Sequence, residues 1–284
     1  MDLNSYMTQF SQDMSIRGFS RRTQSMYLLY VGQFFALHKG VDPKNVTDDH
    51  IRIFLDKRKN MDGVSLSTSN LATAALRNFF LVTMKMDLKI IRIPYHKKGL
   101  DLFPVLNTEE CLKLFDTAGD PKYRALLMVA YSAGLRLSEI MNLQIRDVDR
   151  PREELFIREG KGRRDRKVPL SEKALSVLGD YYRSCKVKPK TYLFPGRTLD
   201  EPLCDSTIHK IFKKATARAG ITKKIRFHTL RHSYATHALE AGMNIRQLQK
   251  ILGHRSVHTT LKYIHIMQDG PQKKVSPLDL LYKK

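Results

Sequence analysis

The helical pattern of this chain breaks at one stretch, Lys89-Ile-Ile-Arg-Ile-Pro-Tyr-His-Lys-Lys-Gly-Leu-Asp-Leu-Phe-Pro104. Its two prolines and basic residues favour an extended linker, because proline disfavours helical backbone at the residue before it. Residues with helical periodicity lie on both sides of the stretch. The sequence therefore predicts two folded units, residues 1–88 and residues 105–284, joined by a linker over residues 89–104.

The first unit is predicted to be helical. Its apolar residues recur at the three- and four-residue spacing that places them on one face of a helix. Four helices are expected, over residues 3–16, after Ser20, after Thr47 and over residues 67–85, with serine and threonine as candidate N-caps.

The second unit is also mainly helical but contains one β signal. Leu155-Phe-Ile-Arg-Glu159 and Arg166-Lys-Val-Pro-Leu170 are typical of short strands, and Gly160-Lys-Gly-Arg-Arg-Asp165 between them is typical of a hairpin turn. Further helices are expected from Thr108 onward and after Ser171. The predicted fold class is mainly α with a small antiparallel β-sheet: a helical N-terminal domain followed by an α+β domain.

The charge of the chain points to a polyanionic partner. Its 284 residues include 50 Lys+Arg against 28 Asp+Glu, a formal net charge of +22, while a hydrophobic content of 42% indicates packed cores rather than disorder. Both parts are basic, with 15 Lys+Arg against 9 Asp+Glu in residues 1–104 and 35 against 19 in residues 105–284. Composition alone does not choose between nucleic acid and an anionic membrane surface, but two positive domains on a basic linker could close around a DNA duplex.

Membrane insertion and secretion are not expected. The longest apolar stretch, residues 125–135, has roughly half the length needed to cross a bilayer. The first ten residues lack the basic flank and apolar run of a secretory signal, and Cys111, Cys185 and Cys204 are odd in number and widely spaced. A cytoplasmic location is therefore expected.

Functional side chains are densest in residues 226–242, Arg226-Phe-His-Thr-Leu-Arg-His-Ser-Tyr-Ala-Thr-His-Ala-Leu-Glu-Ala-Gly242. Thr229 can cap a helix that Gly242 ends. Arg231 then lies near the positive end of the helix dipole, with His228 just outside the helix, and both can face an anion there.

A second arginine follows a glycine in Ser132-Ala-Gly-Leu-Arg-Leu-Ser-Glu139. Gly134 can end the preceding apolar helix, and Arg136 can offer a two-pronged donor to a phosphate. Glu139, three residues later, is placed to orient Arg136.

Together these fragments resemble the tyrosine recombinases, the phage integrase family, and within it the compact two-domain Xer-like or transposon-resolvase type. The fragments, in order, are Ala133-Gly-Leu-Arg136-Leu-Ser-Glu139, Lys161 in the hairpin turn, His228-Thr-Leu-Arg231-His232, Leu252-Gly-His254 and Thr259-Thr-Leu-Lys-Tyr263. The likeness is detailed over about residues 105–270. The N-terminal helices look like the helical core-binding (SAM-like) domain of the family, and the second unit like its catalytic domain.

The resemblance implies a reaction and a set of roles. In the family a tyrosine hydroxyl attacks a DNA phosphodiester, forms a 3′-phosphotyrosyl bond and frees a 5′-hydroxyl, which later attacks the partner strand. By resemblance Tyr263 is the nucleophile, and Arg136 and Arg231 stabilise the negative charge of the transition state. Lys161 protonates the leaving 5′-oxygen, and His228 assists proton transfer at the tyrosine.

The remaining implied features concern the phosphate and the partners. His254 donates a hydrogen bond to a non-bridging oxygen, Glu139 supports Arg136, and no cofactor or metal is expected. The partners are double-stranded DNA with inverted core recognition elements and further copies of the chain, a dimer on each site and a tetramer in the synapse. The tail, residues 269–284, is expected to dock on a neighbouring protomer. Resolution of DNA dimers or transposon cointegrates, and integration or excision of a mobile element, fit the same residues.

Three other interpretations use parts of the same pattern. Asn244, Gly253 and Ser256 could frame a helix-turn-helix of a DNA-binding regulator without chemistry. The pairs His228/His232 and His254/His258 have the spacing of metal ligands on a helix, as in a metal-dependent nuclease. A type IB topoisomerase shares the phosphotyrosine chemistry. His232, His237, His258 and His265 are otherwise assigned to packing, phosphate contact or the surface, with His232 as a possible support of the pocket.

Overall fold

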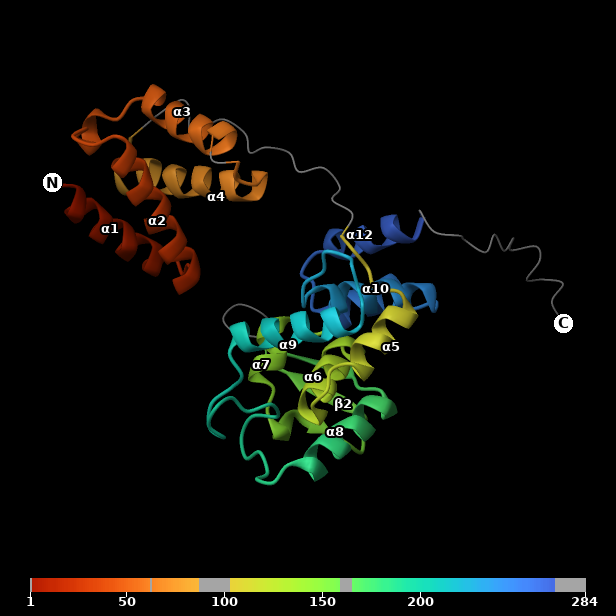
Figure 1. Cartoon of the computed structure of the whole chain (residues 1–284). Helices are drawn as coiled ribbons and strands as arrows, with labels where there is room; N and C mark the ends of the chain where they lie inside the picture. Colours follow the sequence, from red (N-terminus) through yellow and green to blue (C-terminus); the bar gives the residue numbers. More distant parts are fainter. Residues whose placement is uncertain (1, 62, 87–102, 159–164, 269–284) are drawn as a thin grey trace. The chain divides into compact units, whose positions relative to one another are not determined.

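The computed structural model describes residues 2–61, 63–86, 103–158 and 165–268. It divides into two compact units, Met1–Asp101 and Leu102–Lys284 (Figure 1). Most of the predicted linker, residues 87–102, lies outside the described residues. So do the hairpin turn with Lys161 and the tail from residue 269.

The N-terminal unit contains the four predicted helices. They are α1 (Leu3–Ile16), α2 (Arg21–Leu37), α3 (Asp48–Asp56) and α4 (Leu66–Arg77), with a short 3₁₀ turn η1 (Pro43–Asn45) before α3. Ser20 caps α2 by accepting a hydrogen bond from the Thr23 backbone N–H at 3.1 Å. Thr47 and His50 form a reciprocal cap at the start of α3.

Two helices of this unit end in wider π-helical turns. These turns are η2 (Lys57–Met61) and η3 (Asn78–Thr83). The prediction of one continuous helix to Lys85 was wrong in this detail. In η3 both Phe79 and Phe80 are fully buried, with their rings edge to face at 5.1 Å, and the wider winding accommodates both in the core.

The C-terminal unit is built from eight helices and a small sheet among its described residues. The helices are α5 (Thr108–Asp116), α6 (Pro121–Ser132), α7 (Leu137–Asn142), α8 (Glu172–Ser184), α9 (Asp205–Arg218), α10 (Thr229–Glu240), α11 (Ile245–Leu252) and α12 (Val257–Gln268). Helix α6 lies at the centre of the core and packs against α8 and α10 (Figure 1). The predicted fold class, mainly α with a small antiparallel sheet, is confirmed.

The sheet has three antiparallel strands in the order β1-β2-β3. They are β1 (Val148–Asp149), β2 (Glu154–Ile157) and β3 (Arg166–Pro169). The two strands of the predicted hairpin are β2 and β3, in the register that pairs Leu155 with Val168. Strand β1 was not predicted, because two residues are too few to produce a recognisable alternation.

A second, smaller core joins α10, α11 and α12. Ala235, Leu248, Leu252 and Tyr263 are its buried members, and Phe103 packs against them. This cluster fixes the position of α12 against the helix that begins at Thr229.

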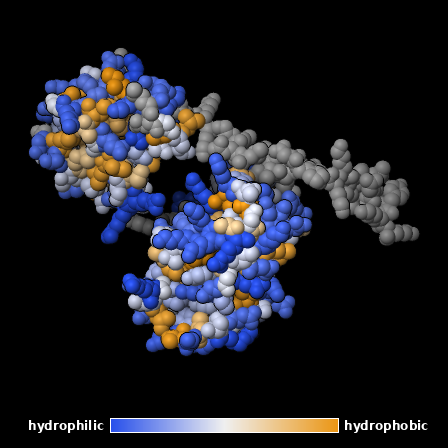
Figure 2. Space-filling model, viewed as in Figure 1, coloured by the Kyte–Doolittle hydropathy of each residue, from blue (hydrophilic) through white to orange (hydrophobic). Residues whose placement is uncertain are grey.

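The surface is mostly polar. On the face drawn in Figure 2, hydrophilic residues cover much of both units and apolar residues appear as scattered patches. Among the residues that the structure describes, no helix is long and apolar enough to span a membrane.

Candidate active site

Two tight turns bring the predicted arginines and histidines together. The turn between α6 and α7 contains Gly134 with φ +57°, and the turn between α11 and α12 contains Gly253 with φ +61°. A Cβ on Gly134 would lie 2.7 Å from a ring carbon of Tyr234 and 2.9 Å from a methyl carbon of Leu252. Glycine is therefore required at position 134 for both its conformation and its lack of a side chain. Arg136 follows as the N-cap residue of α7.

Glu139 is the buried carboxylate at the centre of the site. It accepts hydrogen bonds from the side chain and the backbone N–H of Arg136, and from both terminal nitrogens of Arg166, at 3.1 and 2.9 Å. The guanidinium of Arg231 lies 3.8 Å away. Burial alone raises the pKa of a carboxyl group, but Arg166 and Arg136 outweigh that effect and lower the pKa of Glu139 to about 2. Glu139 is thus a fixed anion that holds three arginines.

Arg166 was not predicted to belong to this cluster. Its sequence context predicts only the start of a strand after the hairpin turn. Its Nε also donates to the Ile251 carbonyl at 2.7 Å, so it ties β3 to α11. The signal that could have revealed it is its position two residues before the buried Val168, on the same face of the strand.

Arg231 is the most deeply buried charged residue of the site, with 1% of its surface exposed. It donates to the carbonyls of Gly134 (2.8 Å) and Leu252, and to Nε2 of His254 at 3.0 Å. Burial and the charge of Arg136 lower its pKa to about 10, so it remains a cation at neutral pH. Arg136 donates to the carbonyls of Leu252 and Gly253, both at 3.0 Å. The two arginines therefore lock the two turns together.

His254 is neutral and its tautomer is fixed by its neighbours. A guanidinium can only donate, so Nε2 accepts from Arg231, and the ring proton lies on Nδ1, facing Oγ1 of Thr260 at 2.9 Å. Burial, followed by the charges of Arg231 and Arg136, lowers the pKa of His254 to about 3. The donor role predicted for His254 therefore requires an exchange of this bond when an anion arrives.

These groups open onto one cavity of about 520 Å³. Its lining residues are Arg136, His228, Arg231, Gly253, His254, Arg255, Ser256 and Thr259. His228, not Thr229 as predicted, is the N-cap residue of α10, and Oγ1 of Thr229 instead accepts from the Arg226 backbone N–H at 3.2 Å. Burial, then Arg231 and Arg136, lower the pKa of His228. The cavity offers fixed positive charge to a phosphodiester.

Tyr263 lies beside this cavity but is buried, with 3% of its surface exposed. Its hydroxyl is 3.1 Å from Nδ1 of His232, and its ring stacks on that of His254 with the centroids 6.4 Å apart. Burial raises the pKa of Tyr263, and Arg231 partly opposes that rise. The structure thus brings five of the six predicted residues to one place, and the sixth, Lys161, lies outside the described residues.

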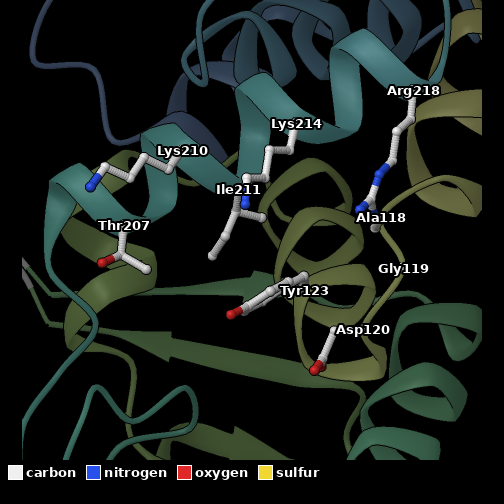
Figure 3. A pocket seen from close by; sticks show the side chains of 9 residues that line it. All are labelled: Ala118, Gly119, Asp120, Tyr123, Thr207, Lys210, Ile211, Lys214 and Arg218. Carbon is white, nitrogen blue, oxygen red and sulfur yellow. The ribbon is translucent and has the colours of Figure 1, made fainter.

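A second cavity, of about 450 Å³, lies on α9 and shares no lining residue with the first. Lys210, Lys214 and Arg218 stand one turn apart on α9, and Lys214 and Arg218 reach from the helix toward the segment that carries Gly119 and Tyr123 (Figure 3). Within the part of the chain that the structure describes, no group of three or more His, Cys, Asp or Glu side chains could hold a metal ion.

Comparison with known proteins identifies the family. Residues 104–269 match the phage integrase family, and residues 6–90 match the phage integrase N-terminal SAM-like domain. The putative integrase/recombinase y4qK of Sinorhizobium fredii is 36% identical over 96% of this chain and 88% of its own length. The tyrosine recombinase XerA of Pyrococcus horikoshii is 31% identical over 92% of this chain and 88% of its own.

Solved structures of lambda integrase share the fold. Lambda integrase in a dimer bound to a COC′ core site superposes with a TM-score of 0.77 and 18% identity, over 98% of this chain and 81% of that chain. Its tetramer bound to a Holliday junction gives a TM-score of 0.76 and 18% identity, over 97% of this chain and 80% of that chain. With both units matched by family and fold, the chain belongs to the phage integrase family, the tyrosine recombinases, and is a site-specific DNA recombinase.

Proposed function

We propose that this recombinase cleaves and rejoins DNA strands through a 3′-phosphotyrosyl intermediate, with Tyr263 as the nucleophile. The observation that carries the proposal is the cavity in which Arg136 and Arg231 are held around Glu139, directly beside Tyr263. Attack on a phosphodiester gives a five-coordinate phosphorus with additional negative charge. Two guanidinium groups whose positions are already fixed by hydrogen bonds to backbone carbonyls meet that charge.

The other predicted residues complete the reaction in this proposal. His228, which lines the cavity, assists proton transfer, and His254 contacts a non-bridging oxygen once its bond to Arg231 is exchanged. Lys161 protonates the leaving 5′-oxygen from the hairpin turn. The energy of the broken phosphodiester is kept in the bond to tyrosine, so rejoining requires no nucleotide cofactor.

We further propose that the protein binds inverted core elements in double-stranded DNA, as a dimer on each site and a tetramer in the synapse. The likeness to lambda integrase bound as a dimer to a core site, and as a tetramer to a Holliday junction, supports this assembly. We propose a cytoplasmic location, because the protein acts on DNA. Among biological roles, resolution of DNA dimers or transposon cointegrates is preferred to integration or excision, since XerA is among the relatives of the chain.

The regulator without chemistry fits the local helices but leaves the arginines unexplained. Asn244 caps α11, Gly253 forms the turn and α12 follows, as a helix-turn-helix requires. However, α12 carries Tyr263 inward, next to Arg231, and a regulator has no need of this arrangement.

The test is a search for a covalent protein–DNA adduct. Wild type, Tyr263→Phe and Tyr182→Phe are incubated with nicked suicide duplexes drawn from the DNA that flanks the gene, with and without EDTA. Tyr182 is a suitable control because it is an exposed tyrosine on α8, outside the cavity. We expect an SDS-resistant adduct with wild type and Tyr182→Phe only, whether or not EDTA is present.

Two results would contradict the proposal. An adduct with Tyr263→Phe would assign the nucleophile to another residue. If wild type binds DNA specifically but forms no adduct on any duplex tested, the DNA-binding regulator without chemistry would be favoured.

A further inference from the structure

The hydroxyl of Tyr263 is held by a histidine to which the sequence assigns no chemical role. Nδ1 of His232, on α10, lies 3.1 Å from the Tyr263 oxygen, on α12. His228 lies one turn earlier on α10 and lines the cavity, and its ring meets His232 edge-on at 4.5 Å. His228 therefore lines the cavity, whereas His232 makes the contact with the Tyr263 hydroxyl.

The direction of this hydrogen bond depends on the tautomer of His232. With the ring proton on Nε2, Nδ1 accepts from the Tyr263 O–H. Burial, followed by the charges of His228 and Arg231, lowers the pKa of His232 to about 3, so the ring is neutral and Nδ1 is free of a proton in this tautomer. The charge of Arg231 also opposes the rise in the pKa of Tyr263 that burial causes.

An aromatic side chain from the start of the C-terminal unit fixes the His232 ring. Phe103 stacks on it with the centroids 4.0 Å apart and the planes 23° apart, and its edge meets Tyr263 at 5.3 Å. The segment that carries Phe103 is anchored three residues later, where the Leu106 backbone N–H donates to the buried Oγ of Ser233 at 2.9 Å. The imidazole is thus held in the plane that directs Nδ1 at the tyrosine.

We propose that His232 is a further catalytic residue of this recombinase, which accepts the Tyr263 proton as the phenolic oxygen attacks the phosphodiester; the inference rests on the function proposed above. The phenolic O–H bond breaks and its proton moves to Nδ1. The oxygen forms a bond to phosphorus, and the bond to the 5′-oxygen breaks. That oxygen leaves with the electron pair and takes a proton from the general acid. In rejoining, His232 returns the proton to Tyr263, so each full cycle leaves it neutral.

The basicity of His232 depends on the substrate. The charged and titratable groups that face it are His228 and Arg231 from α10 and Tyr263 from α12, while the Phe103 segment faces it with an apolar ring. A phosphodiester in the cavity adds negative charge beside Arg231, and this charge offsets the repulsion that disfavours the imidazolium. His232 is therefore a stronger base when DNA occupies the cavity than in the free protein.

The experiment compares His232→Asn with a matched control on the same helix. Asparagine keeps an acceptor near the place of Nδ1 but cannot hold a proton. The control is His237→Asn, because Nδ1 of His237 likewise hydrogen-bonds to a tyrosine, Tyr131, at 2.7 Å, away from the cavity. Single-turnover adduct formation is measured against pH on suicide duplexes, and DNA binding is measured by gel shift.

We expect His232→Asn to bind DNA as wild type does but to form the adduct about 10²–10⁴-fold more slowly at neutral pH. The rate should recover as the pH rises, because Tyr263 then loses its proton unaided. His237→Asn should retain the rate and pH profile of wild type. An unchanged rate in His232→Asn, or a loss that is equal at every pH, would overturn the role of His232.

A second measurement leaves His232 intact. Ring-fluorinated tyrosine at position 263 makes the phenol more acidic. If His232 accepts the proton, the low-pH limb of the profile reports His232 and stays in place. A shift of that limb with the acidity of the phenol would mean that Tyr263 ionises without a base, and would overturn the proposal. Absence of any adduct with wild type would instead overturn the proposed function itself.

Discussion

Arg136 and Arg231, which are both proposed to contact the reacting phosphate, differ in how deeply they are buried. The side chain of Arg231 is 1% exposed and that of Arg136 is 18% exposed. We expect Arg136→Ala and Arg231→Ala each to slow adduct formation about 10²–10³-fold, the usual cost of losing one transition-state donor. Only Arg231→Ala should also lower the free energy of unfolding substantially, since it leaves the buried carbonyls of Gly134 and Leu252 without this donor.

Rates from suicide duplexes and urea denaturation of the same preparations separate the two effects. Equal losses of stability in both variants would contradict the idea that Arg231 is part of the folded core. Tyr182→Phe serves as the reference, because that exposed residue lies outside the cavity.

Glu139 predicts a particular pH dependence of stability. Its pKa is lowered from 4.5 to about 2 in the folded protein, so its contribution is fully present above about pH 4.5 and is lost as the pH falls through 2. Glu139→Gln should unfold more easily at pH 7, by about 3–5 kcal/mol, because a buried ion-pair partner is removed. Its stability should also change less than that of wild type between pH 4.5 and 2. Denaturant midpoints across this window check the slope, and parallel curves would refute the assignment.

The sequence predicts the residues whose type and order are characteristic, but not those whose role depends on contact alone. Arg136, Glu139, His228, Arg231, His254 and Tyr263 were all predicted, and all lie together. Arg166 and Phe103 were not assigned, and His232 was assigned only to packing, phosphate contact, the surface or support of the pocket. Phe103 reaches His232 across more than a hundred residues of chain, and no local pattern encodes such a contact.

At the scale of elements, the turn between α6 and α7 offers the clearest test. Gly134→Ala should be destabilising for two reasons: alanine disfavours φ +57°, and its Cβ would collide with Tyr234 and Leu252. Gly220→Ala is the matched control, because Gly220 has φ +67° but nothing within 4 Å of a built Cβ. It should lose only about 1–2 kcal/mol, the cost of the backbone conformation.

Thermal or urea unfolding measures the stability that each variant loses. The difference between the two losses gives the cost of the contacts with Tyr234 and Leu252 alone. A loss in Gly134→Ala no larger than that in Gly220→Ala would mean that Tyr234 and Leu252 move aside without cost. Adduct formation should also fall in Gly134→Ala, because the turn leads directly into Arg136.

The elements themselves were largely predictable, and the exceptions have local causes. Ser20 marks the start of α2 because its hydroxyl accepts from the Thr23 backbone N–H, and Thr47 marks the start of α3, where its own backbone N–H donates to Nδ1 of His50. The change to π-helical winding at Asn78 was not predictable, since apolar spacing alone does not reveal that both Phe79 and Phe80 must be buried. A cap residue and a residue in the first turn are also hard to distinguish, as His228 and Thr229 demonstrate.

At the scale of the whole molecule, a net charge of +22 predicts DNA binding that weakens steeply with salt. A protein that neutralises about six phosphates has a slope of about −5 in a plot of log affinity against log salt concentration. Arg136→Ala should reduce the magnitude of the slope by about 1, if its guanidinium meets a phosphate. Tyr263→Phe changes no charge and should keep the slope of wild type. Filter binding at several salt concentrations gives all three values, and a shallow slope in wild type would contradict a clamp held by phosphate contacts.

The burial of Tyr263 has a consequence for how the protein travels through a genome. A chain with so much positive charge rests on unrelated DNA for most of its time, and every such encounter presents a phosphodiester to the cavity. If Tyr263 is the nucleophile, as proposed, its burial keeps the hydroxyl away from passing strands, and we expect these strands to be left uncut. Exposing Tyr263 takes free energy that only contacts specific to the correct site supply. We therefore expect strand cleavage to be more selective than DNA binding, so that few nicks arise while the protein searches for its site.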